Sequence, residues 1–402
     1  MASQAALGQR ALPTRVDRYP AKMVSHLAER LVARYARGGE RLLDPFCGSG
    51  AVLAAAQRQG IASTGLDVNP YAVLLARVKT SPVSAPEAAA LCGELVARAG
   101  GSGESLPMVW GAKEYWFTTG TLAKYERLRA AARAMRLGAT AAGRAVLLAL
   151  ALSARACSRA DQRSPKPFIS KYARATRSGR HFDPYQEVPA LLHEFLAFHA
   201  RQHHGARSRI LATDVAREPC LPARVGVHTH VVTSPPYVNA QDYYRNSKLE
   251  LAVLEGVLPF SMAALAGKFI GTERGDLSSG VDGDTASRNR GLVPALSELE
   301  GASPRHAQIV HRYLADMRRA IGSIGTIVPA GGVLVVVCGD NLVGGRHIPT
   351  WRVLATILEE AGFEQFDSFT DRIAQRMVPP RRVGHKGLIK EEHIMAFRRL
   401  SV

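Results

Sequence analysis

One stretch of this sequence, residues 41–78, limits the possible folds more than any other. A short apolar segment, R-L-L, leads into the turn D-P-F-C-G-S-G (44–50), and a strong helix-forming run closed by a glycine follows. The next segment, I-A-S-T-G-L-D (61–67), has the composition of a strand, and Asn69-Pro70 begins another helix. This order of strand, turn, helix, strand and helix predicts a βαβ unit within an α/β fold.

The rest of the chain continues the alternation and predicts a doubly wound, mostly parallel sheet. Residues 79–205 interrupt it with helical periodicity and little strand signal, which predicts a largely helical insertion. The apolar run at 331–340 is typical of a strand buried on both faces. Residues 267–292 are rich in Gly, Ser, Asp and Thr without periodicity and predict a mobile loop. Further strands are expected at 209–214, 227–232, 365–370 and 393–397, and further helices at 19–37, 243–254, 304–323 and 349–361.

Charge is the strongest compositional clue. The 402 residues include 52 Lys and Arg against 34 Asp and Glu, a formal net charge of +18 that favours a polyanionic partner such as nucleic acid. The five cysteines form no C-x-x-C pair, so the pattern supports neither a disulfide framework nor a zinc site and fits a cytoplasmic protein. No uninterrupted apolar run approaches the roughly 18 residues of a membrane span, so no membrane partner is expected.

Three motifs follow predicted strands at their carboxyl ends, where open α/β sheets bind ligands. In the first, residues 44–50, Gly48 and Gly50 let the backbone turn sharply and a ligand approach closely. Asp67 ends the next strand about 20 residues later, where a carboxylate can bind two ribose hydroxyls. The motif has two glycines rather than G-x-G-x-x-G, which favours a nucleoside ligand over a dinucleotide.

The third motif, T-S-P-P-Y (233–237), is the most specific, and we call it the Pro-Pro loop. Its prolines have a fixed φ and no backbone donor, which makes the loop rigid. The Ser234 hydroxyl and the Pro235 carbonyl can accept hydrogen bonds from one amino group, and the Tyr237 ring offers a flat surface for stacking. These features suit a nucleobase that has an exocyclic amino group and has left the base stack.

Together the motifs resemble those of the S-adenosylmethionine-dependent amino-methyltransferases of DNA. The resemblance covers about residues 18–80 and 206–402. It implies a Rossmann-like methyltransferase sheet whose glycine turn binds the methionine part of S-adenosyl-L-methionine, while acids bind the ribose and the adenine amino group. Y-P-A-K-M (19–23) is similar to the segment that closes over the methionine carboxylate, and 242–251 to the helix after the catalytic loop. The cofactor-binding residues expected on this basis are Lys22, Asp44, Pro45, Phe46, Cys47, Gly48, Gly50, Asp67, Val68, Asn69, Asp214 and Thr233.

In that family the Pro-Pro loop is catalytic, which implies roles for Ser234, Pro235, Pro236 and Tyr237. The resemblance implies that the target base is flipped out of double-stranded DNA and stacks on Tyr237. Its amino group donates to Ser234 and to the Pro235 carbonyl, and its nitrogen attacks the sulfonium methyl directly, with no need for a metal. Serine at the first position is more usual for cytosine N4. The implied function is therefore site-specific cytosine-N4 methylation in restriction–modification, with a cognate restriction endonuclease as a partner.

The order of the motifs leaves alternatives open. Many enzymes with a Ser-Pro-Pro-Tyr motif are circularly permuted and have the catalytic motif first, whereas here the glycine turn comes first. The alternatives are an adenine-N6 DNA methyltransferase, an RNA base methyltransferase and a catalytically silent regulatory protein that binds S-adenosylmethionine.

DNA contacts are expected mainly from the insertion. Residues 155–180 contain eight Lys or Arg and one acid, with aromatic residues among them, a composition suited to phosphate contacts and stacking. We therefore predict a split methyltransferase domain over residues 15–80 and 206–402. The segment 81–205 is the expected target-recognition region, and 267–292 is its rival. The expected DNA-binding residues are Arg159, Arg163, Lys166, Lys171, Arg174, Arg177, Tyr244, Arg381 and Arg382.

Overall fold

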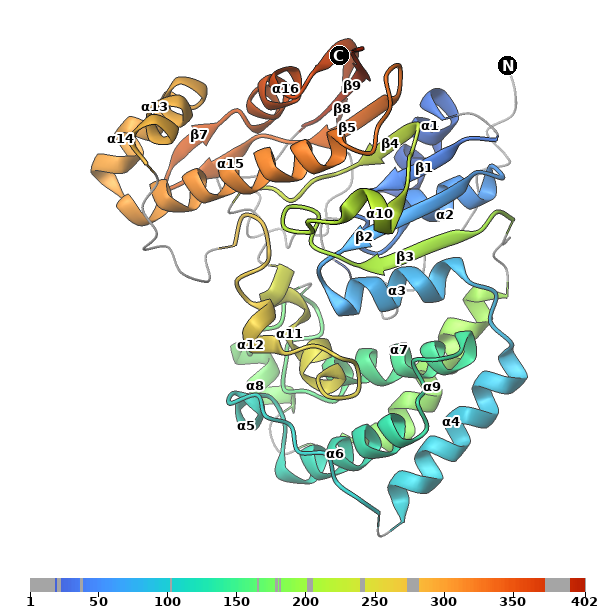
Figure 1. The fold of residues 1–402 in the computed structure, drawn as a ribbon. Helices are drawn as coiled ribbons and strands as arrows, with labels where there is room; N and C mark the ends of the chain where they lie inside the picture. The colour runs from blue at the N-terminus through green and yellow to red at the C-terminus, as the bar shows by residue number, and fades with distance from the viewer. Residues whose placement is uncertain are drawn as a thin grey trace.

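A seven-stranded sheet lies at the centre of the computed structural model (Figure 1). Its strands are β1 Arg41–Asp44, β2 Ala62–Asp67, β3 Ser208–Ala212, β4 His230–Thr233, β5 Val333–Cys338, β8 Phe363–Arg372 and β9 Glu391–Arg399. The residues that the structure describes are 19, 23–36, 39–101, 103–164, 166–177, 180, 182–200, 205–238, 243–272, 282–372 and 391–401.

The strand order, β3-β2-β1-β4-β5-β9-β8, is that of a doubly wound sheet. Strands β1 to β5 pair in parallel, whereas β9 is antiparallel to both β5 and β8. The chain moves outward from β1 through β2 to β3 and then returns to the other side of β1, so the order reverses between β1 and β4. A ligand crevice is expected at such a reversal. The predicted α/β class, a Rossmann-like and mostly parallel sheet with a helical insertion, is confirmed.

Helices cover both faces of the sheet (Figure 1). Leu42 and Leu43 are neighbours on β1 and point to opposite faces, as alternation along a strand requires. Leu42 belongs to the core cluster that contains α1 and α2, and Leu43 to the cluster that contains α15 and α16. The bounds of these helices are α1 Ser25–Tyr35, α2 Ala51–Arg58, α15 Pro304–Gly325 and α16 Thr350–Glu360.

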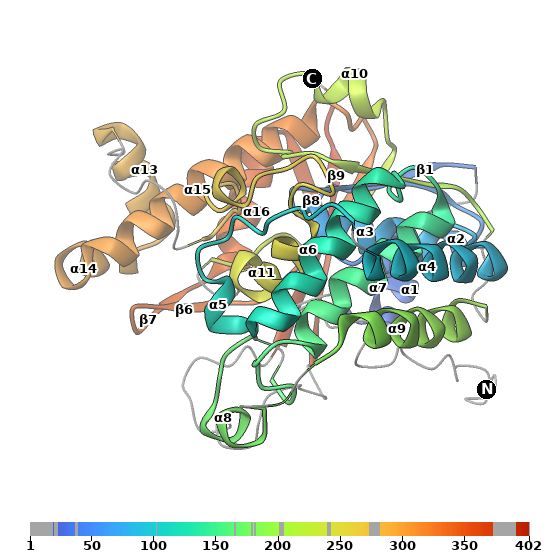
Figure 2. The same ribbon diagram turned by 90° about the horizontal axis from the view of Figure 1, so that it is seen from below.

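The insertion between β2 and β3 forms a helical layer below the sheet (Figures 1 and 2). It packs on α3 (Pro70–Thr80) and on α11 (Tyr243–Leu254), which follows the Pro-Pro loop. Its central helix, α7 (Ala141–Ala156), is buried over most of its length, as its apolar sequence predicts. The other helices of the insertion are α4 Ala85–Gly100, α5 Lys113–Trp116, α6 Thr119–Ala134, α8 Lys171–Arg177 and α9 Pro184–His199.

The structure corrects the sequence-based assignment in several short segments. The prediction of a loop over 267–292 is wrong at its carboxyl end, where α13 (Gly283–Leu292) begins with an N-cap from the Asp282 carboxylate, which accepts the Thr285 amide at 2.8 Å. Periodicity does not reveal this helix because Asn289 is its one buried residue. Residues 273–281 lie outside the described part of the chain. The short elements that the sequence does not predict are α10 Leu221–Val225, α12 Met262–Leu265, α14 Ala295–Ala302, β6 Asn341–Val343 and β7 Arg346–Ile348.

None of the described helices combines the length and the apolar character that crossing a bilayer requires.

A buried arginine ties the insertion to α11. The Arg129 side chain is 1% exposed. Its guanidinium donates to the carbonyls of Val253 at 3.1 Å and Leu106 at 2.6 Å, and also to the carbonyl of Glu255. Burial lowers the pKa of Arg129 to about 10, so the group is still charged near neutral pH.

We expect Arg129→Met to lower the free energy of unfolding by about 2–4 kcal/mol, because it leaves buried carbonyls without donors. Urea denaturation followed by circular dichroism measures this loss. Arg133→Met, at an exposed position on the same helix, is the matched control and should change stability by less than about 0.5 kcal/mol. Equal effects of the two variants would contradict the structural role of Arg129.

Candidate functional site

The glycine turn and the Pro-Pro loop meet because β1 and β4 are neighbours in the sheet. Leu43 on β1 pairs with Val231 on β4, so both strands end at the same edge. There the Thr233 hydroxyl donates to Asp44 Oδ1 at 2.7 Å, across 189 residues of sequence. Asp44 Oδ1 also accepts the Phe46 amide at 3.2 Å, and Asp44 is only 3% exposed. A buried hydrogen bond thus joins the two motifs directly.

The turn after β1 requires its two glycines for different reasons. Gly48 has φ +48°, and a Cβ placed there would lie 3.0 Å from Cε1 of Tyr19. Gly50 has φ +78° at the N-cap of α2, and its Cβ would lie 3.1 Å from that of Ala76 on α3. Side chains at these positions would be strained and would collide, so the turn brings its backbone close to the pocket described below.

Asp67, at the end of β2, holds this turn in place. Its Oδ2 accepts the Gly48 amide at 2.9 Å, and its Oδ1 accepts the Asn69 amide at 2.8 Å. Asn69 in turn caps α3 by accepting the Tyr71 amide at 3.1 Å. A carboxylate offers about four lone-pair positions, so Asp67 can accept further hydrogen bonds from a ligand.

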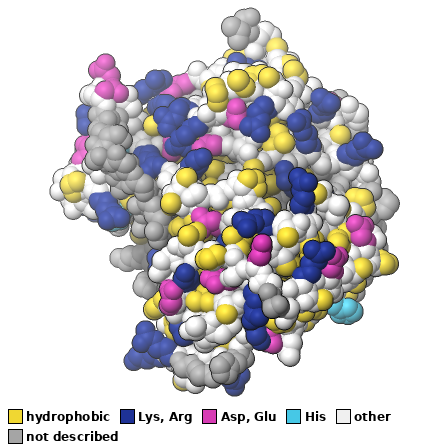
Figure 3. Space-filling model, turned by 60° about the horizontal axis from the view of Figure 1, so that its bottom comes forward, with side chains coloured by type: hydrophobic (Ala, Val, Ile, Leu, Met, Phe, Trp, Pro, Cys, Tyr) yellow, Lys and Arg dark blue, Asp and Glu magenta, His cyan; other side chains and the backbone are white. Residues whose placement is uncertain are grey.

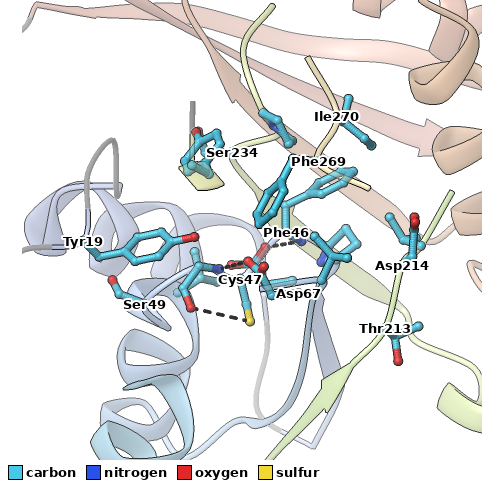
Figure 4. Close-up of a pocket in the computed structure, with 18 of the residues that line it drawn as sticks. Tyr19, Phe46, Cys47, Ser49, Asp67, Thr213, Asp214, Ser234, Phe269 and Ile270 are labelled. Atoms are coloured by element: carbon cyan, nitrogen blue, oxygen red, sulfur yellow. Dashed lines mark hydrogen bonds between the residues drawn. The ribbon is translucent and has the colours of Figure 1, made fainter. Parts of the chain in front are cut away.

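A pocket of about 820 Å³, including its open mouth, lies over these carboxyl ends. Figure 4 shows Tyr19 and Asp214 on opposite sides of it, with Asp67 between them and Phe269 near Ser234. Its lining comes from the amino-terminal segment, the ends of β1 and β2 with the turns after them, the start of α2, the segments after β3 and β4, the start of α11 and the segment after α12. The lining residues are Tyr19, Met23, Asp44, Pro45, Phe46, Cys47, Gly48, Ser49, Ala51, Val52, Asp67, Val68, Thr213, Asp214, Val215, Ser234, Pro236, Tyr243, Lys268, Phe269 and Ile270.

Two buried carboxyl groups give the pocket its electrostatic character. Burial raises the pKa of Asp44 to about 7, against opposing hydrogen bonds from Thr233 and the Phe46 amide. Burial raises the pKa of Asp67 to about 6, against hydrogen bonds from backbone amides. Carboxylates that lose hydration in this way are stabilised by a nearby cation, so the pocket favours a ligand that carries positive charge.

Asp214 follows β3, and an arginine fixes its orientation. Its Oδ2 pairs with Arg217 Nη1 at 2.8 Å, and its Oδ1 accepts the Ala216 amide at 3.1 Å. Arg217 also donates to Asp316 on α15 at 2.7 Å. The sequence motif does not reveal Arg217 or Asp316, because their contact depends on how α15 packs on the sheet.

The structure brings most of the predicted cofactor residues together. Eight of them line the pocket: Asp44, Pro45, Phe46, Cys47, Gly48, Asp67, Val68 and Asp214. Three others support the lining from behind: Gly50 in the turn, Asn69 at the cap of α3, and Thr233 on Asp44. Lys22 lies outside the described residues.

The Pro-Pro loop contributes Ser234 and Pro236 to the lining, whereas Pro235 and Tyr237 are not part of it. The Tyr237 side chain is 7% exposed, and its hydroxyl donates to Glu392 Oε1 at 3.2 Å. Stacking of a base on the Tyr237 ring stays a prediction.

Several lining residues were not among the predicted site residues. Tyr243 lies at the start of α11 and stacks on Tyr19, with ring centroids 6.3 Å apart. Lys268, Phe269 and Ile270 follow α12 and complete the wall near Ser234 (Figure 4). Tyr19, Met23 and Tyr243 fall within segments that resemble family motifs, so that resemblance could have identified them, but the sequence around 268–270 has no comparable signal.

The predicted DNA-binding residues that lie in the described part of the chain fall into two groups, and those of the first make contacts within the protein. Arg159 donates to the Glu114 carbonyl at 2.6 Å, and Arg177 to the Ser158 carbonyl at 3.0 Å. Arg163 pairs with Asp161 at 2.7 Å. Further intramolecular contacts are made by Lys166 and by Tyr244, whose ring meets that of Phe269 edge-on.

The other group consists of Lys171 and Arg174, which are exposed on α8. Figure 3 shows Lys and Arg side chains spread over one face of the molecule with acidic side chains between them, rather than gathered in one patch. Arg381 and Arg382 lie outside the described residues.

We expect Asp44→Asn to stabilise the protein in a pH-dependent way. The folded-state pKa of Asp44, about 7, lies above its ordinary value of 3.8, so the folded protein binds this proton more tightly than the unfolded chain. The stability that this proton confers on the wild type is lost as pH rises from about 4 to about 7. The variant should therefore gain about 2–4 kcal/mol at pH 8 and little near pH 4. Urea denaturation across this range measures the difference, and a gain independent of pH would contradict the buried carboxyl.

Comparison with known proteins finds a family model that matches the amino-terminal part of the chain and one curated relative over a short stretch. Residues 4–77 match the model of the N6/N4 family, described as DNA methylase. Type II methyltransferase M.MjaII of Methanocaldococcus jannaschii is 38% identical over 61 residues, which cover 15% of this chain and 12% of that protein. The match thus spans a small part of this curated relative.

Solved structures give weaker likenesses. TTHA0409 of Thermus thermophilus, described as a DNA modification methylase and solved with S-adenosyl-L-methionine, is 21% identical over 22% of this chain and 38% of that chain, with a TM-score of 0.18. A SAM-dependent methyltransferase of Methanosarcina mazei is 9% identical over 92% of this chain and 98% of that chain, with a TM-score of 0.35. Because both TM-scores are low, the similarity to a protein family rests on the sequence matches alone. Within residues 4–77, this chain is thus similar to the N6/N4 family of DNA methylases.

Proposed function

We propose that this chain transfers a methyl group from S-adenosylmethionine to the exocyclic N4 amino group of cytosine in DNA. The observation that carries the proposal is that the glycine turn and the Pro-Pro loop line one pocket and are joined by the hydrogen bond between Thr233 and Asp44. A donor bound at the turn would therefore lie next to a base bound at Ser234. Methylation at a recognition site would protect that site from a cognate restriction endonuclease.

The residues present fit the proposed cofactor. The two buried carboxyl groups, Asp44 and Asp67, suit a ligand with cationic sulfonium and ammonium groups. Gly48 leaves space beside Tyr19 that a Cβ would fill, so the backbone can approach the methionine part. Asp67 would bind the ribose hydroxyls, and Asp214 would face the adenine end. When bound, the cofactor supplies an electrophilic methyl group on sulfur.

The chain's own groups would orient the amino nitrogen. The Ser234 hydroxyl and the Pro235 carbonyl would accept hydrogen bonds from the amino group, which directs its lone pair away from the ring system. The same acceptors stabilise the positive charge that develops on nitrogen. The rigid Pro-Pro backbone fixes both acceptors before the base arrives, and such positioning is worth several kcal/mol. The Tyr237 ring would support the flipped base. Serine at the first position of the loop favours cytosine over adenine.

The helical insertion is the proposed region of contact with double-stranded DNA. Arg177 of α8 donates to the Ser158 carbonyl at 3.0 Å, and the neighbouring Arg159 amide donates to the Trp116 carbonyl at 2.8 Å. Lys248 of α11 lies 4.3 Å from the centre of the Trp116 ring. Because α11 begins at Tyr243 in the pocket wall, these contacts join α8 to a helix that borders the site.

We expect Ser234→Ala to lower kcat by about 10²–10³-fold, because one acceptor for the reacting amino group is lost. Nucleoside mass spectrometry of DNA from cells expressing the chain measures the product, and methyl transfer from labelled cofactor measures the rate. N4-methylcytosine should be present with the wild type and with Ser25→Ala, an exposed control, and nearly absent with the variant. N6-methyladenine in its place would overturn the assigned base, and full activity of the Ser234 variant would overturn the assigned mechanism.

For DNA binding, we expect the double variant Lys171→Ala with Arg174→Ala to weaken affinity for all sequences alike. Two lost phosphate contacts should reduce the slope of log K against log salt by up to about 2. Fluorescence anisotropy with a labelled duplex at several salt concentrations measures this slope. The control removes Arg30 and Arg41, exposed cations of α1 and the start of β1, and changes the net charge equally. Equal loss in both double variants would mean that α8 has no specific role.

A further inference from the structure

The Pro-Pro loop is anchored from a distant strand. The Tyr237 hydroxyl donates to Glu392 Oε1 at 3.2 Å, and these residues lie 155 positions apart in the sequence. Glu392 belongs to β9, which pairs antiparallel with β5. In the sheet, β5 lies between β9 and β4, the strand that leads into the Pro-Pro loop. Tyr237 is 7% exposed, so its hydroxyl needs a partner inside the protein.

The position of Glu392 is unfavourable for a carboxylate. Asp371 on β8 is its direct partner in the strand pairing, and like charges in such a pair destabilise a sheet. Burial, and next the Asp371 charge, raise the pKa of Glu392 against the hydrogen bond from Tyr237. The cost of the carboxylate therefore points to a role at the site beyond packing.

The segment around Gly271 also lies close to the backbone of the Pro-Pro loop. Gly271 has φ +75°, and a Cβ there would lie 2.9 Å from the Tyr237 carbonyl oxygen. The neighbouring residues, Phe269 and Ile270, line the pocket. The backbone of Tyr237 thus lies close to this segment and its hydroxyl is bound by Glu392, while Ser234, three residues earlier, lines the pocket.

We propose that Glu392 is a positioning residue, which acts through the Tyr237 hydroxyl to hold the Pro-Pro loop with Ser234 facing the pocket. The inference rests on the proposed function, since it assigns Glu392 a part in orienting the acceptor of the amino group. It adds a role for the Tyr237 hydroxyl to the proposed support of the base by the Tyr237 ring.

The test compares Glu392→Ala, Glu392→Gln, Tyr237→Phe and the double variant Tyr237→Phe with Glu392→Ala in methyl-transfer assays on DNA. Loss of a hydrogen bond to a charged acceptor should lower kcat about 10-fold or more in Glu392→Ala and in Tyr237→Phe. The double variant should be no slower than Tyr237→Phe, since that substitution already removes the contact with Glu392. Glu392→Gln should stay within about threefold of wild type, because its amide oxygen can accept the same bond. KM and Kd for S-adenosylmethionine should stay within about twofold of wild type, since the anchor does not touch the glycine turn.

The matched control is Glu391→Ala. Glu391 is the preceding residue on β9, and its carboxylate pairs with the exposed Arg372 at 3.4 Å. We expect this variant to keep wild-type kcat, because solvent-exposed pairs contribute little.

Each other outcome has a definite meaning. An active wild type whose Tyr237→Phe and Glu392→Ala variants keep full kcat would overturn the inference and leave the proposed function standing. Glu392→Gln as slow as Glu392→Ala would overturn the acceptor role. A loss of cofactor affinity equal to the loss of rate would indicate general damage and would also overturn the inference. A wild-type chain that methylates no amino group in DNA would overturn the proposed function and, with it, the inference.

Discussion

The site depends on the pairing of β1 with β4, which the hydrogen bond between Thr233 and Asp44 completes at the edge of the sheet. The two strands are short, and the chain between them runs out through β2 and β3 and through the whole helical insertion before it returns. Closing so long a segment costs conformational entropy, but that cost grows only slowly with length. The insertion can therefore be large without separating the two motifs.

That junction is held together at a cost in stability. Asp44 and Asp67 lose hydration, and the hydrogen bonds from Thr233 and from backbone amides offset only part of the loss. Asp67 nevertheless shapes the turn through the Gly48 amide. Functional sites commonly carry such unfavourable groups, which the surrounding fold stabilises. Glu392 on β9 is a further unfavourable carboxyl group, because it is partly buried and pairs with Asp371 on β8.

The insertion shows that a basic segment is not uniformly a binding surface. Arg129, Arg159 and Arg177 donate to main-chain carbonyls and join helices and loops to one another. Arginine suits this task because its planar group donates to several acceptors at once. The exposed cations, such as Lys171 and Arg174, are the ones proposed to meet phosphates. The positive charge of the sequence thus divides into a structural and an exposed part, and only the folded chain distinguishes them.

Sequence patterns were most informative where the structure depends on residues that are close together in the sequence. The turn at 44–50, the acid at 67, the cap at Asn69 and the helix from Tyr243 to Leu254 all follow from residue types at fixed spacing, because glycine, proline and capping residues fix the adjacent backbone. The polar helix α13 and the short hairpin of β6 and β7 have no comparable sequence pattern. Their formation depends on packing against neighbouring elements.

The sequence by itself determined the α/β class and placed both motifs at the ends of strands. Only the tertiary structure decided which partners those motifs receive: Glu392 on Tyr237, Asp316 on the Arg217 that pairs with Asp214, and Phe269 in the pocket wall. These contacts join residues on different elements, and their geometry depends on strand order and helix packing. No local spacing along the chain encodes that geometry.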